Sequence, residues 1–476
     1  GGLASPRASG TVEAVNLSYD GHRLEKAAAE CLFSETGLYI RHLSLQRGSA
    51  RLEGDLRAEL NRWRLEEGSS ISGEITFKGL PLEELAAEGQ PALPATGTLA
   101  GKFRLSGTRS RPELSGRLEA VAGTLYGRRF ESLQAAIAYA PGLLRIESLD
   151  ARAAGQGRLR ASGTFRHATE NWRNGELSFD ITAQGVPLDL LRPEVKLPEI
   201  LQARLELQFR GRAAVNDAAL RLLALDGKLA ARNVLYSGRP AGSLELTVEN
   251  SSGELRLAAA GELFNSKLLG RGAARLQGLY PFNGEISFSR ISWSRLKTAL
   301  GESTLPNLPA DIQTGGVVYL SGSALDPASW RARLELPGVE IFPPAEIKTA
   351  VRSLRSAGVV VISATRKTIR VVSASFAGPD MSVSITGGMD LGDQQNTVDL
   401  RLRGRIDLSF LNGLESGITA AGDSLIEATI RGPWPKPEFY GRLEFKKATL
   451  NLSDLPNGLE DAGGVILLYR DRAVIE

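Results

Sequence analysis

Residue types that could do catalytic chemistry are present in this 476-residue chain, but they are not grouped. A zinc site or an activated nucleophile would need histidine or cysteine. His22, His42 and His167 lie far apart, and none has another histidine or cysteine at the short spacing of a zinc site. Cys31 is the only cysteine, which excludes an internal disulfide, and we expect it to be a small buried apolar residue. The sequence therefore predicts no metal site and no cofactor.

Carboxylates are abundant, but their positions are those of solvated strand residues. Glu119, Glu176 and Glu206 each lie between apolar neighbours, so they fall on the polar side of an alternating pattern. The chain has no G-x-S-x-G elbow and no phosphate-binding P-loop, and the glycine-rich stretch from Gly155 lacks the helix that a phosphate cradle needs. We therefore expect that the chain is not an enzyme.

The strongest pattern is the strict alternation of apolar and polar residues. In RLELQFR, which begins at Arg204, the apolar side chains fall on one face and the charged or polar side chains on the other. The same alternation occurs in GELSFDITA from Gly175, SLELTVEN from Ser243 and VDLRLRG from Val398. A period of two predicts β-strands with one apolar face, and a single wet face is typical of antiparallel sheets.

The chain also repeats a longer motif about every 106 residues. The motif is GTVEAVNLSYDG from Gly10, GRLEAVAGTLYG from Gly116 and GKLAARNVLYSG from Gly227. A degenerate copy, RARLELPGVEIF, begins at Arg331, and GRLEFKKATLNL begins at Gly441. Repetition of this kind predicts one supersecondary unit stacked several times, with its function spread along the stack.

Two further sequence features repeat with the same period as this motif. Glycines follow short strand-like runs at Gly107, Gly211, Gly322 and Gly432. A strand with a helix-like tail recurs in the segments that begin at Ile71, Arg173, Phe282 and Asn396. We therefore divide the chain into units of about six strands: 1–96, which begins within a unit, 97–201, 202–313, 314–419 with an insertion, and the partial unit 420–476. In the insertion, residues 342–356 have the apolar spacing of a short helix.

The number of strands limits the possible architectures. About 27 strands, spaced about 4.8 Å apart, would form a sheet about 130 Å long. A flat sheet of that size is not expected, and the sequence supplies no layer to cover its apolar face. We predict an all-β, elongated, repeating β-groove: curved antiparallel sheets stacked into an open taper with a hydrophobic interior, and short helices between repeats. A parallel β-helix would repeat at a much shorter period.

Charge and hydropathy argue against a nucleic-acid-binding surface and against a membrane-spanning helix. The net charge of +3 is nearly neutral for this length, which argues against a nucleic-acid-binding surface. No apolar run approaches the 18 residues of a membrane-spanning helix. The chain begins and ends within repeats, so we expect it to be part of a longer parent protein.

The repeats resemble a known family. The segment from Ser115, SGRLEAVAGTLYGRRFESLQAAIAYAPGLLRIESLDARAAGQGRLRASGTF, is similar to the repeat of the AsmA-like superfamily, and in particular of its TamB-type members from the translocation and assembly module. RGPWPKPEFYGRLEFKKATLNL, from Arg431, is the second strong match. The resemblance implies a periplasmic location, a parent anchored in the inner membrane by an N-terminal helix absent from this chain, and transfer of phospholipid to the outer membrane. It also implies a possible outer-membrane β-barrel partner, bound through other parts of the parent.

An apolar groove fits such a function, because it shields acyl chains from water along their path. We expect the groove to be lined by the apolar-phase residues Leu99, Phe103, Leu105, Leu177, Phe179, Ile181, Leu205, Leu207, Phe209, Leu244, Leu246, Val248, Ile286, Phe288, Leu400, Leu402, Leu443 and Phe445. The alternatives are a scaffold that assists assembly of outer-membrane β-barrel proteins and a structural stack whose core is closed and dry.

Overall fold

The computed structural model describes residues 7–19, 22–85, 95–125, 128–153, 155, 157–169, 171–191, 200–217, 219–300, 311–342, 353–379, 381–392, 395–409, 418–434, 436–452, 458–470 and 472–475. Over these residues the chain forms 29 strands, two short 3-10 helices and one α-helix. The predicted all-β, repetitive, antiparallel fold class is confirmed. The chain divides into unit 1, Gly1–Leu197 with Ala203–Ala231, and unit 2, Pro198–Gln202 with Arg232–Glu476.

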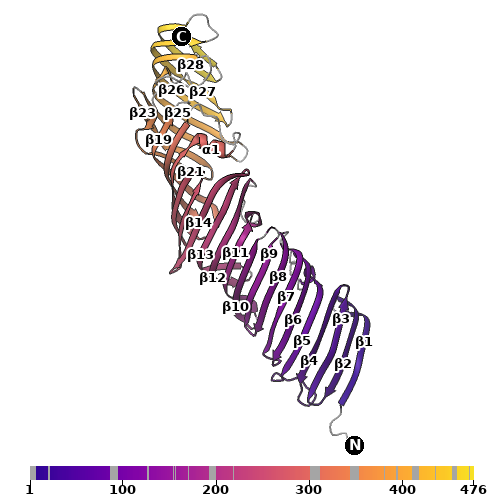
Figure 1. Ribbon diagram of the computed structural model, residues 1–476. Coiled ribbons are helices and arrows are strands. Elements are labelled where there is room, and N and C mark those ends of the chain that lie inside the picture. Colours follow the sequence, from indigo (N-terminus) through magenta and orange to yellow (C-terminus); the bar gives the residue numbers. More distant parts are fainter. Residues whose placement is uncertain are drawn as a thin grey trace, which may run out of the picture. The chain divides into compact units, whose positions relative to one another are not determined.

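Unit 1 is a meander in which each of the strands β1 to β11 pairs with the strand that follows it. Figure 1 shows these strands following one another in chain order along a curved sheet. Its elements are β1 (Arg7–Tyr19), β2 (His22–Ser34), β3 (Gly37–Arg47), β4 (Ala50–Glu59), β5 (Ile71–Pro81), η1 (Leu82–Leu85), β6 (Ala95–Gly107), β7 (Pro112–Leu125), β8 (Arg128–Ala140), β9 (Leu143–Ala153), β10 (Arg158–Ala168), β11 (Asn171–Pro187), η2 (Leu188–Leu191), β12 (Leu201–Asn216) and the first part of β13 (Ala219–Tyr236).

Unit 2 is a second antiparallel meander. Its elements after β13 are β14 (Arg239–Ser251), β15 (Glu254–Leu263), β16 (Ser266–Arg275), β17 (Pro281–Ser292), α1 (Trp293–Leu300), β18 (Asp311–Ser323), β19 (Asp326–Phe342), β20 (Leu354–Ser356), β21 (Val360–Thr365), β22 (Thr368–Ser373), β23 (Ser375–Gly378), β24 (Met381–Asp390), β25 (Thr397–Asp407), β26 (Ile418–Pro433), β27 (Glu438–Leu452), β28 (Leu459–Arg470) and β29 (Arg472–Ile475).

Two rows of this second sheet are interrupted strands. Strands β20 and β21 both pair with β19, and β22 and β23 both pair with β24. The two rows also pair with each other, through β20 with β23 and β21 with β22. Beside the break, the N–H of Ala357 in one row donates to the carbonyl of Ser375 in the other row, at 2.8 Å. Each pair of short strands therefore occupies the place of one longer strand.

The long sequence repeat corresponds to a period of six strands. Its copies lie on β1, β7, β13, β19 and β27. Successive copies are six strands apart when each interrupted row is counted once. The repeat boundaries drawn from the sequence remain predictions. The described chain separates into two compact units, and their border lies near residues 197–232.

A β-bulge recurs on the first strand of the repeat. Ala122 of β7 and Lys447 of β27 have positive φ angles of 49° and 50°, and the pairing with the preceding strand shifts by one residue at each. The same shift occurs in β19, between Glu335 and Gly338, opposite β18. A bulge adds one residue to one strand, which bends it and increases the local twist. Its recurrence bends the sheet in the same way at these three copies of the repeat.

The sequence predicted four strands that are each followed by a helix-like tail, and helical turns follow three of them. They are η1 after β5, η2 after β11 and α1 after β17, as the sequence predicted. The fourth tail, beyond Ser409, lies outside the described residues. The helix predicted over residues 342–356 is wrong at its end, because Leu354 begins strand β20; residues 343–352 lie outside the described part. Leu354 is drawn instead into a buried cluster of strand side chains.

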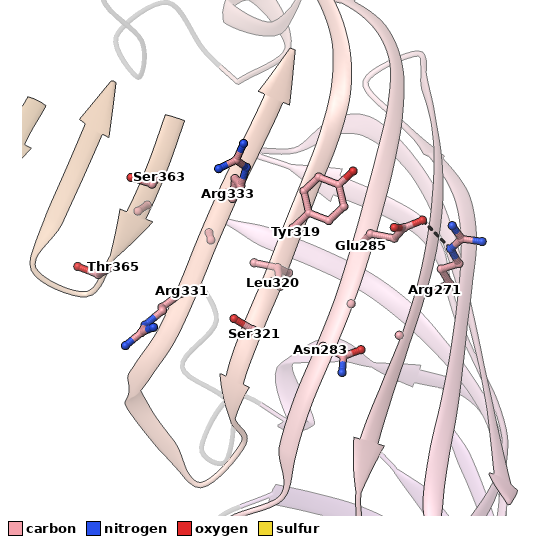
Figure 2. A pocket seen from close by; sticks show the side chains of 14 residues that line it. Arg271, Asn283, Glu285, Tyr319, Leu320, Ser321, Arg331, Arg333, Ser363 and Thr365 are labelled. Atoms are coloured by element: carbon pink, nitrogen blue, oxygen red, sulfur yellow. Dashed lines mark hydrogen bonds and ion pairs between the residues drawn. The ribbon is translucent and has the colours of Figure 1, made fainter. Parts of the chain in front are cut away.

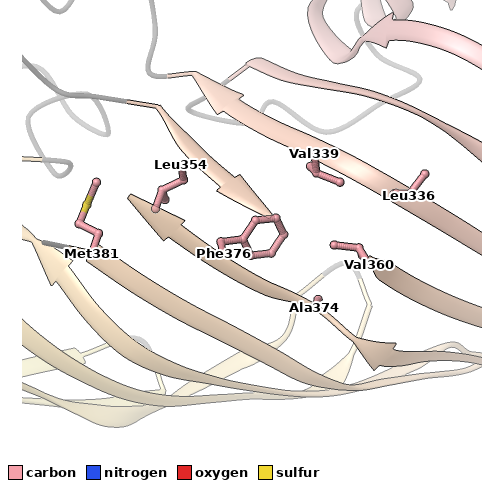
Figure 3. Packing of buried hydrophobic residues seen from close by; sticks show 7 residues of the cluster. All are labelled: Leu336, Val339, Leu354, Val360, Ala374, Phe376 and Met381. Carbon is pink, nitrogen blue, oxygen red and sulfur yellow. The ribbon is translucent and has the colours of Figure 1, made fainter. Parts of the chain in front are cut away.

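The larger buried apolar cluster of unit 2 surrounds the interrupted strands (Figure 3). It contains Leu336, Val339, Leu354, Val360, Ala374, Phe376 and Met381. A smaller cluster in the same unit contains Leu408, Ala420, Leu443, Phe445 and Ala448. No large side chain of the described residues is completely buried, as expected of single-layer sheets.

Candidate functional site

The nine groove-lining residues predicted within unit 1 all lie on one face of its sheet. Phe103 of β6 lies opposite Gly116 of β7, and the pairing continues without a change of face to Phe179 of β11. Ile181 of β11 then lies opposite Phe209 of β12. Residues directly opposite each other in a sheet project from the same face. The face therefore includes Leu99, Phe103, Leu105, Leu177, Phe179, Ile181, Leu205, Leu207 and Phe209.

Unit 2 has an equivalent face. Leu246 of β14 lies opposite Ala259, and the pairing leads through β15 and β16 to Ile286 of β17. It continues through β18, β19, β21, β22 and β24 to Leu400 of β25, and through β26 to Leu443 of β27. The predicted residues on this face are Leu244, Leu246, Val248, Ile286, Phe288, Leu400, Leu402, Leu443 and Phe445. We call each of these surfaces the apolar face of its unit.

Neither apolar face is covered by a second layer in the described part of the chain. Each strand contacts its neighbours in the sheet, η1 contacts β5 and β6, and α1 contacts β14, β17 and β18. Most of the predicted residues are half-buried by lateral packing, and Ile286 is 37% exposed. The more deeply buried ones are Leu99, Leu205, Val248, Leu443 and Phe445. Apolar faces of this length exceed the patches that soluble proteins usually expose.

Large side chains on the apolar face lie flat over glycines of the neighbouring strand. A Cβ atom added at Gly116 would lie 2.5 Å from Cδ1 of Phe103, and one added at Gly101 would lie 2.7 Å from Cζ of Phe77. The rings of Phe77 and Phe103 are stacked, with centroids 6.1 Å apart. The glycines thus lower the aromatic rings toward the backbone and keep the surface of the face shallow.

The opposite face of each sheet carries cross-strand ion pairs and open clefts. A cleft of about 740 Å³ in unit 2 crosses β16 to β21 (Figure 2). Arg271 pairs there with Glu285 on the next strand, and Arg333 with Glu335 along its own strand. In unit 1, a hydrogen bond from Arg158 holds the pKa of Asp150 below its usual value, with the charges of Arg158 and Arg160 acting in the same direction against desolvation. These contacts keep one face of the sheet wetted.

The two long edges of each sheet differ. The helices η1 and η2 in unit 1, and α1 in unit 2, all lie in connections on one edge, which we call the helix edge. Asp311 of β18 accepts a hydrogen bond from the N–H of Ser294 in the first turn of α1. Burial raises the pKa of Asp311, but hydrogen bonds from Ser294, Gln313 and Ser292 outweigh this effect, so its pKa lies below the usual value.

The opposite edge carries tryptophans that sequence reasoning treated as scattered; we call it the tryptophan edge. In unit 1 it holds Trp63, between β4 and β5, and Trp172, at the start of β11. In unit 2 it holds Trp330, near the start of β19, and Trp434, after β26. Only the strand pairing reveals this arrangement, because it shows which turns share an edge. Trp293, in α1, lies at the helix edge.

The ring contacts place Trp172 and Trp330 on the apolar side of this edge. Trp172 stacks on His167 at 4.1 Å and on Tyr139 at 5.2 Å, and both partners are in the apolar phase of their strands. His167 is buried, and its Nδ1 donates to the Ala168 carbonyl at 2.8 Å. Trp330 meets Phe282 edge-on at 5.5 Å. The result is an aromatic border along one side of each apolar face.

The described residues contain no group of three histidine, cysteine, aspartate or glutamate side chains that could hold a metal ion. Among the same residues, no helix is both long and apolar enough to cross a membrane. No protein-family model matches the chain, and a comparison with curated proteins finds no match.

Proposed function

We propose that this chain is a bridge-like conduit for phospholipids, whose acyl chains slide along the apolar faces. The observation that carries the proposal is the apolar face of each unit, which continues from strand to strand in register and has no second layer over it in the described ranges. The proposed location is the periplasm, between the inner and outer membranes. That part rests on the resemblance of the repeats to AsmA-like proteins.

The energetics of lipid transfer support the proposal. Each methylene removed from water contributes about 0.8 kcal/mol, so a sixteen-carbon chain crossing water would lose roughly 12 kcal/mol. An apolar face that repeats every six strands offers similar sites along its length. A lipid would therefore meet neither a large barrier nor a deep trap as it moves. The chemistry of the described residues includes no energy-transducing site, so we propose that transfer is passive or driven by another component.

The exposure of its side chains supports an open face. Ile286, on the apolar face of unit 2, is 37% exposed. A large exposed apolar surface rimmed by polar residues is typical of a surface that binds a ligand, a membrane or another protein. The shallow relief produced by the glycines leaves space above the face for an acyl chain.

Mass spectrometry of an organic extract tests the proposal first. The chain is purified without detergent, and its extract is compared with that of a mock purification. We expect several phospholipid molecules per folded chain. A lipid-free extract from a well-folded sample would contradict the proposal and favour a dry core or a protein client.

Photo-crosslinking separates the lipid conduit from the β-barrel scaffold. Benzoylphenylalanine replaces Phe179 on the apolar face or, as the matched control, Ser178 on the opposite face of the same strand. We expect lipid adducts at position 179 and none at position 178. Adducts with polypeptide in place of lipid at position 179 would support the scaffold and overturn the conduit.

A further inference from the structure

The two edges of each sheet offer different surroundings to the polar end of a lipid. Resting on the proposed function, we infer that the phosphate-bearing headgroup of a bound phospholipid lies along the tryptophan edge, with the indole rings at the level of the glycerol. The acyl chains then extend inward over the apolar face. Four observations carry this assignment: the position of the rings, the cations beside two of them, the hydrogen bonds of nearby carboxylates and the structure of the opposite edge.

The indole rings are placed at the boundary between apolar surface and water. Trp172 is 50% exposed, Trp330 48% and Trp434 45%, although each ring lies at the end of an apolar face. The indole N–H of Trp172 has no acceptor within the described residues, whereas that of Trp330 donates to the Ser323 carbonyl at 2.9 Å. Tryptophan combines a large apolar ring with one polar N–H and is enriched where apolar and aqueous regions meet.

Basic residues accompany two of the exposed tryptophans. Arg173 follows Trp172, and Lys436 lies two positions after Trp434. Both cations are exposed, and in the part of the chain that the structure describes neither of them forms an ion pair. Arg331, which follows Trp330, lines the cleft on the polar face instead. Arginine and lysine at such positions bind phosphate oxygens by charge-assisted hydrogen bonds.

Carboxylates near this edge are engaged by donors of the chain itself. Glu66, close to Trp63, accepts a hydrogen bond from the side-chain amide of Asn61 at 2.9 Å. Asp326, close to Trp330, accepts one from the backbone N–H of Ala328 at 3.1 Å. Hydrogen bonds within the chain thus hold these carboxylates, while Arg173 and Lys436 remain without an ion pair among the described residues.

The helix edge is less suited to a headgroup. Leu82 of η1 lies 3.4 Å from the position that a Cβ on Gly97 would take, so this turn covers the end of the unit 1 face. In unit 2, the guanidinium of Arg239 donates to the Thr298 carbonyl of α1. Helical turns thus occupy this edge, and the basic residue there is held by one of them.

Quenching of single-tryptophan variants by nitroxide-labelled phospholipids tests the assignment. Variants of the full chain retain only Trp172, Trp330 or Trp293, with the other tryptophans changed to phenylalanine. A fourth variant lacks all five and carries Phe209→Trp on the apolar face. Each is loaded with phosphatidylcholine labelled on its choline group or near the end of one acyl chain. Circular dichroism confirms that each variant is folded.

We expect the headgroup label to reduce the emission of Trp172 and Trp330 more than the acyl label does. The order should reverse for Phe209→Trp, and Trp293 should be the least affected by the headgroup label. Quenching at Phe209→Trp without headgroup quenching at Trp172 and Trp330 would overturn this assignment and leave the conduit standing. Absence of quenching at Phe209→Trp would overturn the conduit itself. Stronger headgroup quenching at Trp293 would place the headgroup at the helix edge.

Charge substitutions give an independent test. Arg173→Gln should lower headgroup quenching of Trp172 and leave acyl quenching of Phe209→Trp unchanged. Arg331→Gln removes an exposed arginine of the polar face, so it is the matched control and should leave headgroup quenching of Trp330 unchanged. Equal effects of the two substitutions would contradict a specific contribution of the edge cation.

Discussion

The ring of Phe103 lies directly over Gly116 on the neighbouring strand, where an added Cβ would come within 2.5 Å of Cδ1. Gly10 holds the equivalent position in the first copy of the repeat, and a Cβ added there would meet no atom within 4 Å. One repeat position thus has two surroundings. Gly116 lies against the Lys102 carbonyl and the Phe103 ring of β6, whereas Gly10 lies on β1, which has no strand before it among the described residues.

Gly116→Ala should destabilise the chain by about 1–3 kcal/mol, because the ring of Phe103 and the backbone carbonyl of Lys102 must both move away from the added methyl group. Gly10→Ala should change stability by no more than about 0.5 kcal/mol, since its methyl group enters open space. Urea unfolding of both variants measures the difference. Equal effects would show that the ring does not depend on the glycine.

Leu207→Glu should stop lipid passage, because a carboxylate on the apolar face would have to be desolvated whenever an acyl chain passed over it. Gln208→Glu places the same side chain on the opposite face of β12 and should transport normally. Phe179→Glu should behave as Leu207→Glu does. Transfer of labelled phospholipid between donor and acceptor vesicles gives the readout, with circular dichroism as the control for folding. Normal transfer by either apolar-face variant would contradict the groove.

Asp311 makes a pH-dependent contribution to the stability of unit 2. Because its folded pKa is lowered, its contribution is complete above the usual carboxyl value near 3.9 and is lost as the pH falls through the folded pKa. Asp311→Ala should cost about 0.5–2 kcal/mol at neutral pH, the usual range for a helix cap. The difference from the parent chain should shrink toward pH 3. Asp311→Asn should show a smaller loss that shrinks in the same way, because the titrating carboxylate is in the parent chain. A pH-independent difference for Asp311→Ala would contradict the assigned titration.

Two apolar substitutions separate an open face from a closed core. Phe376 is 8% exposed within the buried cluster, so Phe376→Ala should cost about 3–5 kcal/mol. Ile286 is 37% exposed on the apolar face, and Ile286→Ala should cost less than the roughly 2–5 kcal/mol of a buried isoleucine. Thermal unfolding compares the two. A full core penalty at Ile286 would indicate that the face is packed against something.

Alternation was sufficient to predict the apolar face, because a side-chain period of two assigns every residue of a regular strand to a face. Leu205, Leu207 and Phe209 illustrate this, since they remain in phase on β12. The bulge at Ala122 and the interruption at Ala374 were not predicted, because both depend on the pairing with neighbouring strands. Pairing also determines that Trp63 and Trp172 share an edge.

The period of six strands has a consequence for how such a chain can grow. Six is an even number, so each repeat returns the backbone to the edge from which it started and travelling in the same direction. Duplication of a whole repeat would therefore add length without exchanging helical turns for tryptophans along either edge, and without inverting the two faces. An odd number of strands would reverse this polarity at every duplication. Parity in the strand count thus allows the protein to be lengthened by gene duplication while each side keeps its chemical character.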